Sequence, residues 1–395
     1  MSESSSREAR LFREVRFDNL LSFGPGMPAL ALDNLNVLIG PNGSGKSNLI
    51  EALGVLRASP GDLRAVIRQG GGVSEWIWKG NPRGAASIEA VVANPQGRQP
   101  LRHVLAFRTE NQAFRLEDER IENERPYDGQ EDAYFYYRYQ HGRPVAWVSG
   151  EERALKREAV DPDLSVLAQR RDPEVYPVLS YLAGAYERVR IFREWSFGSH
   201  AVFRQPQKAD ARNDGLEEDF SNLGLFLNRL RRVPKAKSAL LAALRDLYEG
   251  LSDFDVSVEG GTVQVFFTEG DYVIPATRLS DGTLRYLCLA AILCDPEPPP
   301  LVCIEEPELG LHPDILPKVA DLLAAAAEAT QVIVTTHSDI LVDAMTDRPQ
   351  AVVVCEKHNH QTTMRRLEKA ALEHWLERYR LGQLWTRGEL GGTRW

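Results

Sequence analysis

The sequence predicts an α/β protein with a mixed sheet, an antiparallel β subdomain and an inserted helical lobe. The mixed sheet is predicted by three apolar runs, "NLNVLIG", "PPPLVCIEEP" and "TQVIVTTHS", which read as buried strands with helices between and after them. Strand-like text from residue 88 to residue 148 predicts the antiparallel subdomain, and helical periodicity from residue 164 to residue 251 predicts the inserted lobe.

Length and composition describe a globular, acidic chain. Its 395 residues suffice for two or three domain-sized units, and a content of 43% apolar and 26% charged residues is typical of a folded protein. The formal net charge is −9, so any contact with nucleic acid would have to come from a local basic patch.

Three features predict a cytoplasmic protein without a membrane segment. The opening "MSESSSREAR" contains no apolar core of a signal peptide, and the longest apolar run, "LCLAAILC", is far shorter than a membrane span. The cysteines form no C-x-x-C pair, so we expect reduced thiols in the protein core. They are Cys288, Cys294, Cys303 and Cys355.

The stretch "GPNGSGKSNL" follows the first buried strand and opens a helix. Its spacing, Gly40-x4-Gly45-Lys46-Ser47, fits a P-loop that holds the phosphates of a nucleotide. Glycines let backbone N–H groups approach the β-phosphate, while Lys46 can reach the β- and γ-phosphates and Ser47 can bind Mg²⁺. The alternative is a plain glycine turn. The predicted ATP contacts are Asn42, Gly43, Ser44, Gly45, Lys46, Ser47 and Asn48.

Two carboxylates follow the apolar run 301–304, where a nucleotide-hydrolysing site needs acidic side chains. Glu305 suits the Mg²⁺ shell, and Glu306 is placed to orient or deprotonate the attacking water. Because successive strand residues point to opposite faces, both roles require the strand to end here, and Pro307 is consistent with that. The alternative is a surface glutamate pair at a strand end.

Histidines occur in two contexts with different expectations. His337 ends the next buried strand, in "VIVTTHS", and can hydrogen-bond the γ-phosphate, so we predict a catalytic role for it; the alternative is a structural histidine. His358 and His360 in "KHNHQ" have no third metal ligand nearby, and we expect a hairpin turn there.

The order of four motifs resembles the ATP-binding-cassette (ABC) ATPases of the SMC, RecF and OLD group. The motifs are "GPNGSGKSN", "LSDGT" at residues 279–283, "IEEPELGLHP" and "TTHS". The match to stand-alone OLD/RecF-like ATPases is closest, and it implies a P-loop NTPase fold of the ABC-head type that uses ATP and Mg²⁺. The chain departs from the family at Asp281 and Thr283 of the second motif, and at Glu305, where many relatives have Asp.

In this family "LSDGT" would be the signature motif, which implies a homodimer. Two subunits pack head to tail, and each signature loop caps the ATP of the other subunit, so Ser280 and Gly282 would contact the γ-phosphate in trans. The start of the following helix adds a second anion-binding end. Read alone, "LSDGT" is also an ordinary turn and N-cap. The Q-loop glutamine of the family stays open among Gln69, Gln140 and Gln205.

The motifs divide the chain into three predicted parts. Residues 1–150 would form an ATPase lobe with the P-loop and the antiparallel β subdomain. Residues 151–250 would form the inserted helical lobe, and residues 251–395 the second half of the ATPase core with a helical tail. Transporter ATPase domains have a much shorter insertion, and SMC heads have a long coiled coil that this sequence lacks.

The sequence therefore predicts an ATPase that dimerises around two ATP molecules and acts as a switch or motor in DNA-related work. Anti-phage defence or DNA repair is the expected setting. A separate effector such as a nuclease is expected, because the tail is too short for the nuclease domain of OLD proteins. The alternative is an ATP-dependent switch that holds a toxin or effector without DNA contact; a transporter ATPase subunit is a third hypothesis.

Two segments are candidates for direct contact with nucleic acid. "NRLRRVPKAK" can form a phosphate-contact patch, and "YFYYRYQHGR" can form a stacking surface. The acidic total favours simpler interpretations, a solvated helix end and an aromatic-rich strand. The cations of the first segment are Arg229, Arg231, Arg232, Lys235 and Lys237.

Overall fold

The structure is a computed structural model that describes residues 10–140, 143–148, 151–154, 160–161, 163–195, 198, 201, 204–205 and 207–392. The chain divides into two compact units. The first comprises Met1–Val189, Val353–Arg366 and Gly391–Trp395, and the second comprises Arg190–Val352 and Leu367–Leu390. The predicted division into three parts, with boundaries at residues 150 and 250, differs from these two units and stays a prediction.

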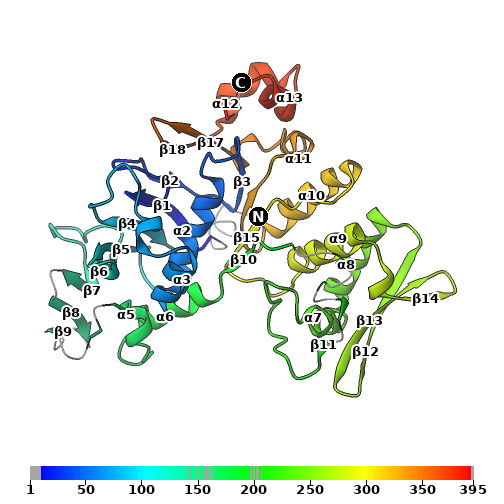
Figure 1. The fold of residues 1–395 in the computed structure, drawn as a ribbon, viewed down its shortest axis with the longest axis horizontal. Helices are drawn as coiled ribbons and strands as arrows, with labels where there is room; N and C mark the ends of the chain where they lie inside the picture. The colour runs from blue at the N-terminus through cyan, green and yellow to red at the C-terminus, as the bar shows by residue number, and fades with distance from the viewer. Residues whose placement is uncertain are drawn as a thin grey trace. The chain divides into compact units, whose positions relative to one another are not determined.

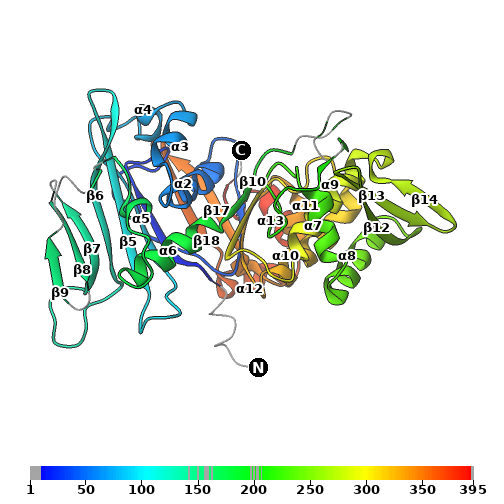
Figure 2. The same ribbon diagram turned by 90° about the horizontal axis from the view of Figure 1, so that it is seen from below.

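The first unit contains a long antiparallel sheet. Among the described residues its eight strands follow the order β2-β1-β4-β5-β6-β7-β8-β9, and every neighbouring pair is antiparallel (Figures 1 and 2). They are β1 (Phe12–Asp18), β2 (Leu30–Ala31), β4 (Ala86–Val92), β5 (Leu101–Glu110), β6 (Ala113–Asn123), β7 (Phe135–Gln140), β8 (Arg143–Val148) and β9 (Glu151–Ala154). This sheet confirms the predicted antiparallel β subdomain.

The first unit also contains the strand that leads into the P-loop. β3 (Leu35–Ile39) is buried along its whole length, and one of its two neighbours in the strand order is β17 (Val352–His358). β17 pairs antiparallel with β18 (Gln361–Arg366). The helices are α2 (Lys46–Ala58), α3 (Leu63–Gln69), α4 (Val73–Trp76), α5 (Val166–Gln169) and α6 (Pro177–Glu187). α2 buries one apolar face, which includes Leu49, Ile50, Leu53 and Leu56.

The turn between β17 and β18 confirms the hairpin expected at "KHNHQ". His358 pairs with Gln361, and the two residues between them, Asn359 and His360, have φ values of 48° and 63°. Two left-handed residues in succession make the tight turn whose twist matches that of antiparallel strands. In the described part of the chain, no group of three or more His, Cys, Asp or Glu side chains can hold a metal ion by itself.

The second unit contains a parallel sheet and a smaller antiparallel sheet. β15 (Leu301–Glu305) pairs in parallel with β10 (Arg190–Phe192) and β16 (Gln331–Thr335), and both longer strands are apolar and largely buried. The antiparallel sheet consists of β11 (Gln207–Lys208), β12 (Leu251–Glu259), β13 (Thr262–Glu269) and β14 (Tyr272–Pro275). Parallel and antiparallel pairing together confirm the α/β class.

The helices of the second unit include α7 (Leu223–Leu230) and α8 (Pro234–Leu247) from the stretch 151–250 of the predicted helical lobe, whereas α5 and α6 from the same stretch belong to the first unit. The second unit also contains α9 (Asp281–Leu293), α10 (Leu316–Ala326), α11 (Asp339–Asp343), α12 (Lys369–Leu376) and α13 (Leu381–Thr386). Short 3₁₀ turns occupy Ala276–Arg278, Pro313–Ile315 and Pro349–Ala351. α7 and α8 pack on β12, so the lobe includes a small sheet as well as helices.

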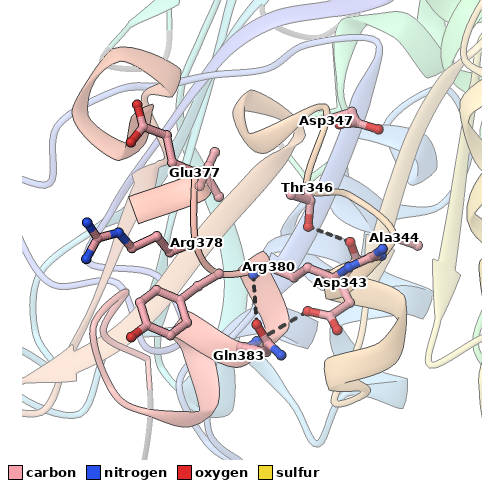
Figure 3. Close-up of a pocket in the computed structure, with 10 residues that line it drawn as sticks. Asp343, Ala344, Thr346, Asp347, Glu377, Arg378, Arg380 and Gln383 are labelled. Atoms are coloured by element: carbon pink, nitrogen blue, oxygen red, sulfur yellow. Dashed lines mark hydrogen bonds between the residues drawn. The ribbon is translucent and has the colours of Figure 1, made fainter. Parts of the chain in front are cut away.

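A polar pocket of about 450 Å³ lies between the end of α11 and the C-terminal helices (Figure 3). Hydrogen bonds at the start of α13 join residues that line it: the Arg380 N–H donates to Gln383 Oε1 (3.0 Å), and the Gln383 N–H donates to Asp343 Oδ1 (3.2 Å). The Leu381 N–H donates to Thr346 Oγ1 (3.1 Å). These bonds fix the polypeptide tail onto α11, and no predicted site residue lines the pocket.

The cysteines occupy apolar surroundings, as the sequence predicts. All four are free thiols, and Cys288, Cys303 and Cys355 are buried. Burial raises the pKa of Cys355 to about 12, so its thiol stays protonated and unreactive near neutral pH. Within the residues that the structure describes, no helix combines the length and the apolar character needed to cross a membrane.

Candidate functional site

The P-loop joins β3 to α2 in the first unit. Lys46 begins α2 and is only 6% exposed. Its Nζ donates hydrogen bonds to the backbone oxygens of Gly40 (2.8 Å) and Pro41 (3.1 Å). The ammonium group therefore lies over the loop, which is where a lysine of this pattern meets phosphate oxygens. Asn42, Gly43 and Ser47 are exposed, and Ser44 is buried.

Glycine is needed at different positions of the loop for different structural reasons. Gly45 has φ 98°, and a Cβ on it would collide with the Thr362 hydroxyl; a Cβ on Gly40 would collide with the backbone oxygen of Cys355. These two glycines allow the loop to pack against β17 and β18. Gly43 has φ 77°, and a Cβ added to it would meet no atom within 4 Å, so open space remains at the middle of the loop.

A cluster of hydroxyl groups anchors the loop from outside the motif. Thr362 Oγ1 donates to the Ser44 carbonyl (2.9 Å), and it lies 2.6 Å from Ser22 Oγ, whose hydroxyl can donate to it. Asn48 Nδ2 donates to the same Ser22 oxygen (2.6 Å). Asn48 is predicted to contact ATP, and the structure shows its amide engaged with Ser22. Ser22 and Thr362 carry no recognisable sequence signal because they come from opposite ends of the chain.

The start of α2 offers an electropositive end to an anion. The N-cap is Gly45, and among the described residues no side chain caps this helix and no acidic residue lies in its first turn. The first N–H groups of a helix lack partners within the helix and carry partial positive charge. A phosphate group would satisfy them, so the P-loop geometry fits a nucleotide.

The acidic pair lies at the end of β15 in the second unit. β15 ends at Glu305, and Glu306 adopts a left-handed conformation with φ 48°. The strand therefore ends between the two carboxylates, which meets the geometric requirement of both predicted roles. The Glu306 N–H donates to the Thr335 carbonyl (3.0 Å), and His337 Nε2 lies 3.6 Å from Glu306 Oε1. The structure thus brings the two predicted catalytic side chains together.

Glu305 lies in surroundings that suit a cation. Its Oε1 lies 3.0 Å from Nε of Arg193, and its side chain is 19% exposed. The indole N–H of Trp195 donates to the Glu305 carbonyl (2.8 Å). A carboxylate that is largely withdrawn from water needs a positive partner, and here a guanidinium supplies it. The position therefore fits a Mg²⁺ ligand whose charge Arg193 balances in this structure.

Glu308 is a member of the site that sequence analysis missed. Its Oε1 accepts hydrogen bonds from Thr336 Oγ1 (2.7 Å) and from the backbone N–H of His337 (2.7 Å). Burial raises the pKa of Glu308, while these two bonds act in the opposite direction. Glu308 therefore holds the turn that carries His337. The third glutamate of "EEPE" is the only sequence signal that pointed to it.

Replacing Glu308 by alanine is expected to slow hydrolysis about tenfold or more, because His337 would lose its fixed position beside Glu306. ATP affinity is expected to stay within about twofold. The unpaired His337 N–H should also lower the free energy of unfolding by about 1–3 kcal/mol. Turnover assays, ATP titration and urea unfolding measure the three effects. Glu308→Gln keeps the acceptor oxygen and should stay nearer the parent; parental turnover in Glu308→Ala would contradict the positioning role.

The "LSDGT" segment forms a capped helix start. Ser280 Oγ accepts a hydrogen bond from the Thr283 N–H (3.1 Å) at the N-cap of α9. A hydrogen bond from Arg204, at 2.7 Å, lowers the pKa of Asp281. A Cβ on Gly282 would lie 3.2 Å from the Gly310 carbonyl. Both the N-cap and the signature interpretation place the Ser280 hydroxyl at this helix end.

The predicted site residues thus fall into three groups. The P-loop group belongs to the first unit, and the acidic group with His337 belongs to the second. Ser280 and Gly282 form a third group at the start of α9, also in the second unit. The two predicted Mg²⁺ ligands, Ser47 and Glu305, belong to different units.

The two candidate nucleic-acid segments have simpler explanations. Three cations of "NRLRRVPKAK" form ion pairs with aspartates of the same unit, which supports the interpretation as a solvated helix end. The pairs are Arg229–Asp295, Arg231–Asp255 and Lys237–Asp253. Most of the second segment is β7, where Tyr137 and Tyr139 are buried in the core, while its His141 and Gly142 lie outside the described residues. Their burial supports the interpretation as an aromatic-rich strand.

Solved structures with a similar fold indicate the structural class of the protein. An Smc head solved with the C-terminal winged-helix domain of ScpA gives a TM-score of 0.55 at 17% identity, over 91% of this chain and 99% of that one. An Smc head from Pyrococcus furiosus, bound to the C-terminal domain of ScpA, gives 0.54 at 14% identity over 93% and 98%. One from Pyrococcus yayanosii gives 0.50 at 14% over 93% and 99%. The fold is that of an SMC-type ABC ATPase head.

The sequence family is narrower than the fold. Residues 35–343 match the family described as "AAA domain, putative AbiEii toxin, Type IV TA system", and the chain belongs to this family. No curated protein matches the sequence. The family match and the fold together confirm the predicted P-loop ATPase domain with the fold of an SMC-type ABC head.

Proposed function

We propose that the protein binds ATP with Mg²⁺, hydrolyses it and dimerises around two ATP molecules. The observation that carries the proposal is the Glu306–His337 pair at the end of a buried parallel strand, in a chain that also has a complete P-loop. Glu306 would act as the general base for water, and His337 would hydrogen-bond the γ-phosphate. Ser47 and Glu305 would hold Mg²⁺. ATP would contact Asn42, Gly43, Ser44, Gly45, Lys46, Ser47 and Asn48.

The homodimer would complete each site with the partner's signature loop. Ser280 and Gly282 stand at the start of α9, where a helix N-terminus and a hydroxyl favour an anion. A two-fold arrangement makes both composite sites identical. The resemblance to SMC heads supports this assembly by fold alone.

The biological role that we propose is a switch or motor in DNA-related work, in anti-phage defence or DNA repair, with a separate effector such as a nuclease. A second candidate is a switch that holds a toxin or effector without touching DNA. The ion-paired basic segment favours this second candidate, because it offers less free positive charge to phosphates. The description of the family as a putative toxin of a toxin–antitoxin system also supports a protein partner.

Replacing Ser280 by arginine tests the dimer. The bulky cation would stand where the signature loop must meet the partner's ATP, so turnover is expected to fall to background while ATP affinity of the single subunit stays within about twofold. Steady-state ATPase assays and ATP titration measure both, and Ser74→Arg, at an exposed serine on α4, is the control. Full activity of Ser280→Arg would show that each subunit hydrolyses ATP without its neighbour's loop.

The same variant separates the two biological candidates. Tagged parent and Ser280→Arg chains are recovered from cells with ATP present, with and without nuclease treatment. A protein that co-purifies with the parent alone after nuclease treatment would support the effector switch. Co-purification of DNA that depends on Ser280 would support the DNA-related role. Mixing Ser280→Arg with Lys46→Ala chains rebuilds one composite site, so recovered ATPase activity would support reciprocal assembly directly.

A further inference from the structure

Arg193 is set beside Glu305 by the register of two parallel strands. β10 pairs with β15 so that Phe192 lies opposite Ile304. Arg193 directly follows the end of β10, and Glu305 directly follows Ile304 on β15, so this pairing brings the two residues near each other. The 3.0 Å ion pair is therefore a consequence of strand pairing and of the two residue types at these positions.

The segment after β10 is held in place by a second set of contacts. The Trp195 indole donates to the Glu305 carbonyl (2.8 Å). The Trp195 ring packs against Phe220, with ring centroids 5.4 Å apart, and the Arg285 guanidinium lies 5.3 Å from its centroid. These contacts fix the backbone two residues beyond Arg193. The backbone is therefore held both before Arg193, by the pairing of β10, and after it, by the contacts of Trp195. This keeps the guanidinium close to the Glu305 carboxylate.

A guanidinium and a metal ion compete for the same carboxylate. Glu305, Glu306 and Glu308 place three acidic groups within four residues, so positive charge is required at the end of β15. Arg193 supplies one positive charge, with its Nε 3.0 Å from Glu305 Oε1. Mg²⁺ supplies two charges and needs near-octahedral oxygen ligands at about 2.0–2.1 Å, often with waters between. An oxygen of Glu305 that joins such a shell has to give up its contact with Arg193.

We propose that the Arg193 guanidinium occupies the Glu305 carboxylate in place of Mg²⁺ and is displaced by the metal. It neutralises the carboxylate while no nucleotide is bound, and it leaves when ATP brings the metal. The inference rests on the proposed function, because it requires Glu305 to join the Mg²⁺ shell. Its consequence is measurable: Arg193 reduces the gain in ATP affinity that Mg²⁺ provides, since the metal first has to displace it.

The test measures that gain without hydrolysis. A fluorescent, non-hydrolysable ATP analogue is titrated in excess Mg²⁺ and in EDTA, and the ratio of the two affinities is the metal enhancement. Arg193→Met is expected to raise the enhancement about two- to fivefold, the range of a partly exposed ion pair. Arg193→Lys keeps a cation and should stay closer to the parent. Arg212→Met, which removes the Arg212–Asp214 ion pair elsewhere in the second unit, is the control.

A double-mutant cycle assigns the effect to the pair. In a Glu305→Gln background, Arg193→Met should no longer change the enhancement, because the group over which the cations compete is gone. An unchanged or smaller enhancement in Arg193→Met, with a parent that depends on Mg²⁺, would overturn the displacement of Arg193 by the metal and leave the proposed function intact. A parent that binds the analogue equally well in EDTA would overturn the Mg²⁺ role of Glu305, and the inference with it.

Discussion

Glu306→Gln is expected to bind ATP as tightly as the parent and to hydrolyse it about 10²-fold more slowly or worse. The substitution replaces a carboxylate by an amide of the same shape, so it removes the base and little else. The ATP-bound dimer should then accumulate, because hydrolysis no longer dissolves it. Single-turnover assays and size-exclusion chromatography with light scattering measure the two results.

The conformation of Glu306 explains why this residue, rather than its neighbour, is expected to be the base. The left-handed φ of 48° turns the chain after β15, and the hydrogen bond from its N–H to the Thr335 carbonyl holds that turn. A non-glycine residue in this conformation costs free energy, so the surrounding structure has to enforce it. The carboxylate is thereby aimed at His337, whereas Glu305 remains on the strand beside Arg193.

Glu305→Gln is the matched control for that prediction. It should weaken the Mg²⁺ dependence of ATP binding, because it removes the predicted metal ligand and leaves the base in place. If Glu305→Gln were the variant that binds ATP normally and fails to hydrolyse it, the roles of the two glutamates would be exchanged. Parental turnover in Glu306→Gln would exclude it as the general base.

The parts of the molecule that are encoded locally were predictable from the sequence. The P-loop, the end of β15 and the turn at Asn359 each depend on residues within a few positions of one another, and their glycines, carboxylates or turn residues are visible as patterns. The antiparallel subdomain was predictable for the same reason, because its strands follow one another along the chain. The left-handed conformation of Glu306 had a weaker signal, the proline that follows it.

The contacts between distant segments were not predictable. Ser22 and Thr362 anchor the P-loop from opposite ends of the sequence, and neither residue type is unusual in its local context. Arg193 faces Glu305 only because β10 pairs with β15, and a three-residue strand gives almost no periodic signal. The ion pairs of the basic segment were unpredictable for the same reason, because their aspartates lie elsewhere in the sequence. A run of cations looks like a phosphate-contact surface until the aspartates opposite it are known.

Lys46→Ala is expected to reduce ATP affinity at least about 10²-fold. The loss has two parts. The mutation removes charge-assisted hydrogen bonds to the β- and γ-phosphates, each typically about 1.5–3 kcal/mol. It also removes the ammonium that bonds the Gly40 and Pro41 carbonyls, so the loop loses an internal support before nucleotide arrives. Titration with a fluorescent ATP analogue measures the affinity, and thermal unfolding shows whether the loop change affects the fold.

Lys79→Ala provides the comparison for Lys46. Lys79 also belongs to the first unit, but it is exposed and paired with Glu75 on the surface, so its removal should leave ATP affinity unchanged. Lys46→Arg is informative in a different way: it keeps the charge, but its wider, forked head does not fit the space where a compact ammonium is only 6% exposed. Binding should therefore fall with arginine as well. Equal affinity of Lys46→Ala and the parent would mean that the glycine-rich loop is a structural turn, and the nucleotide would have to bind elsewhere.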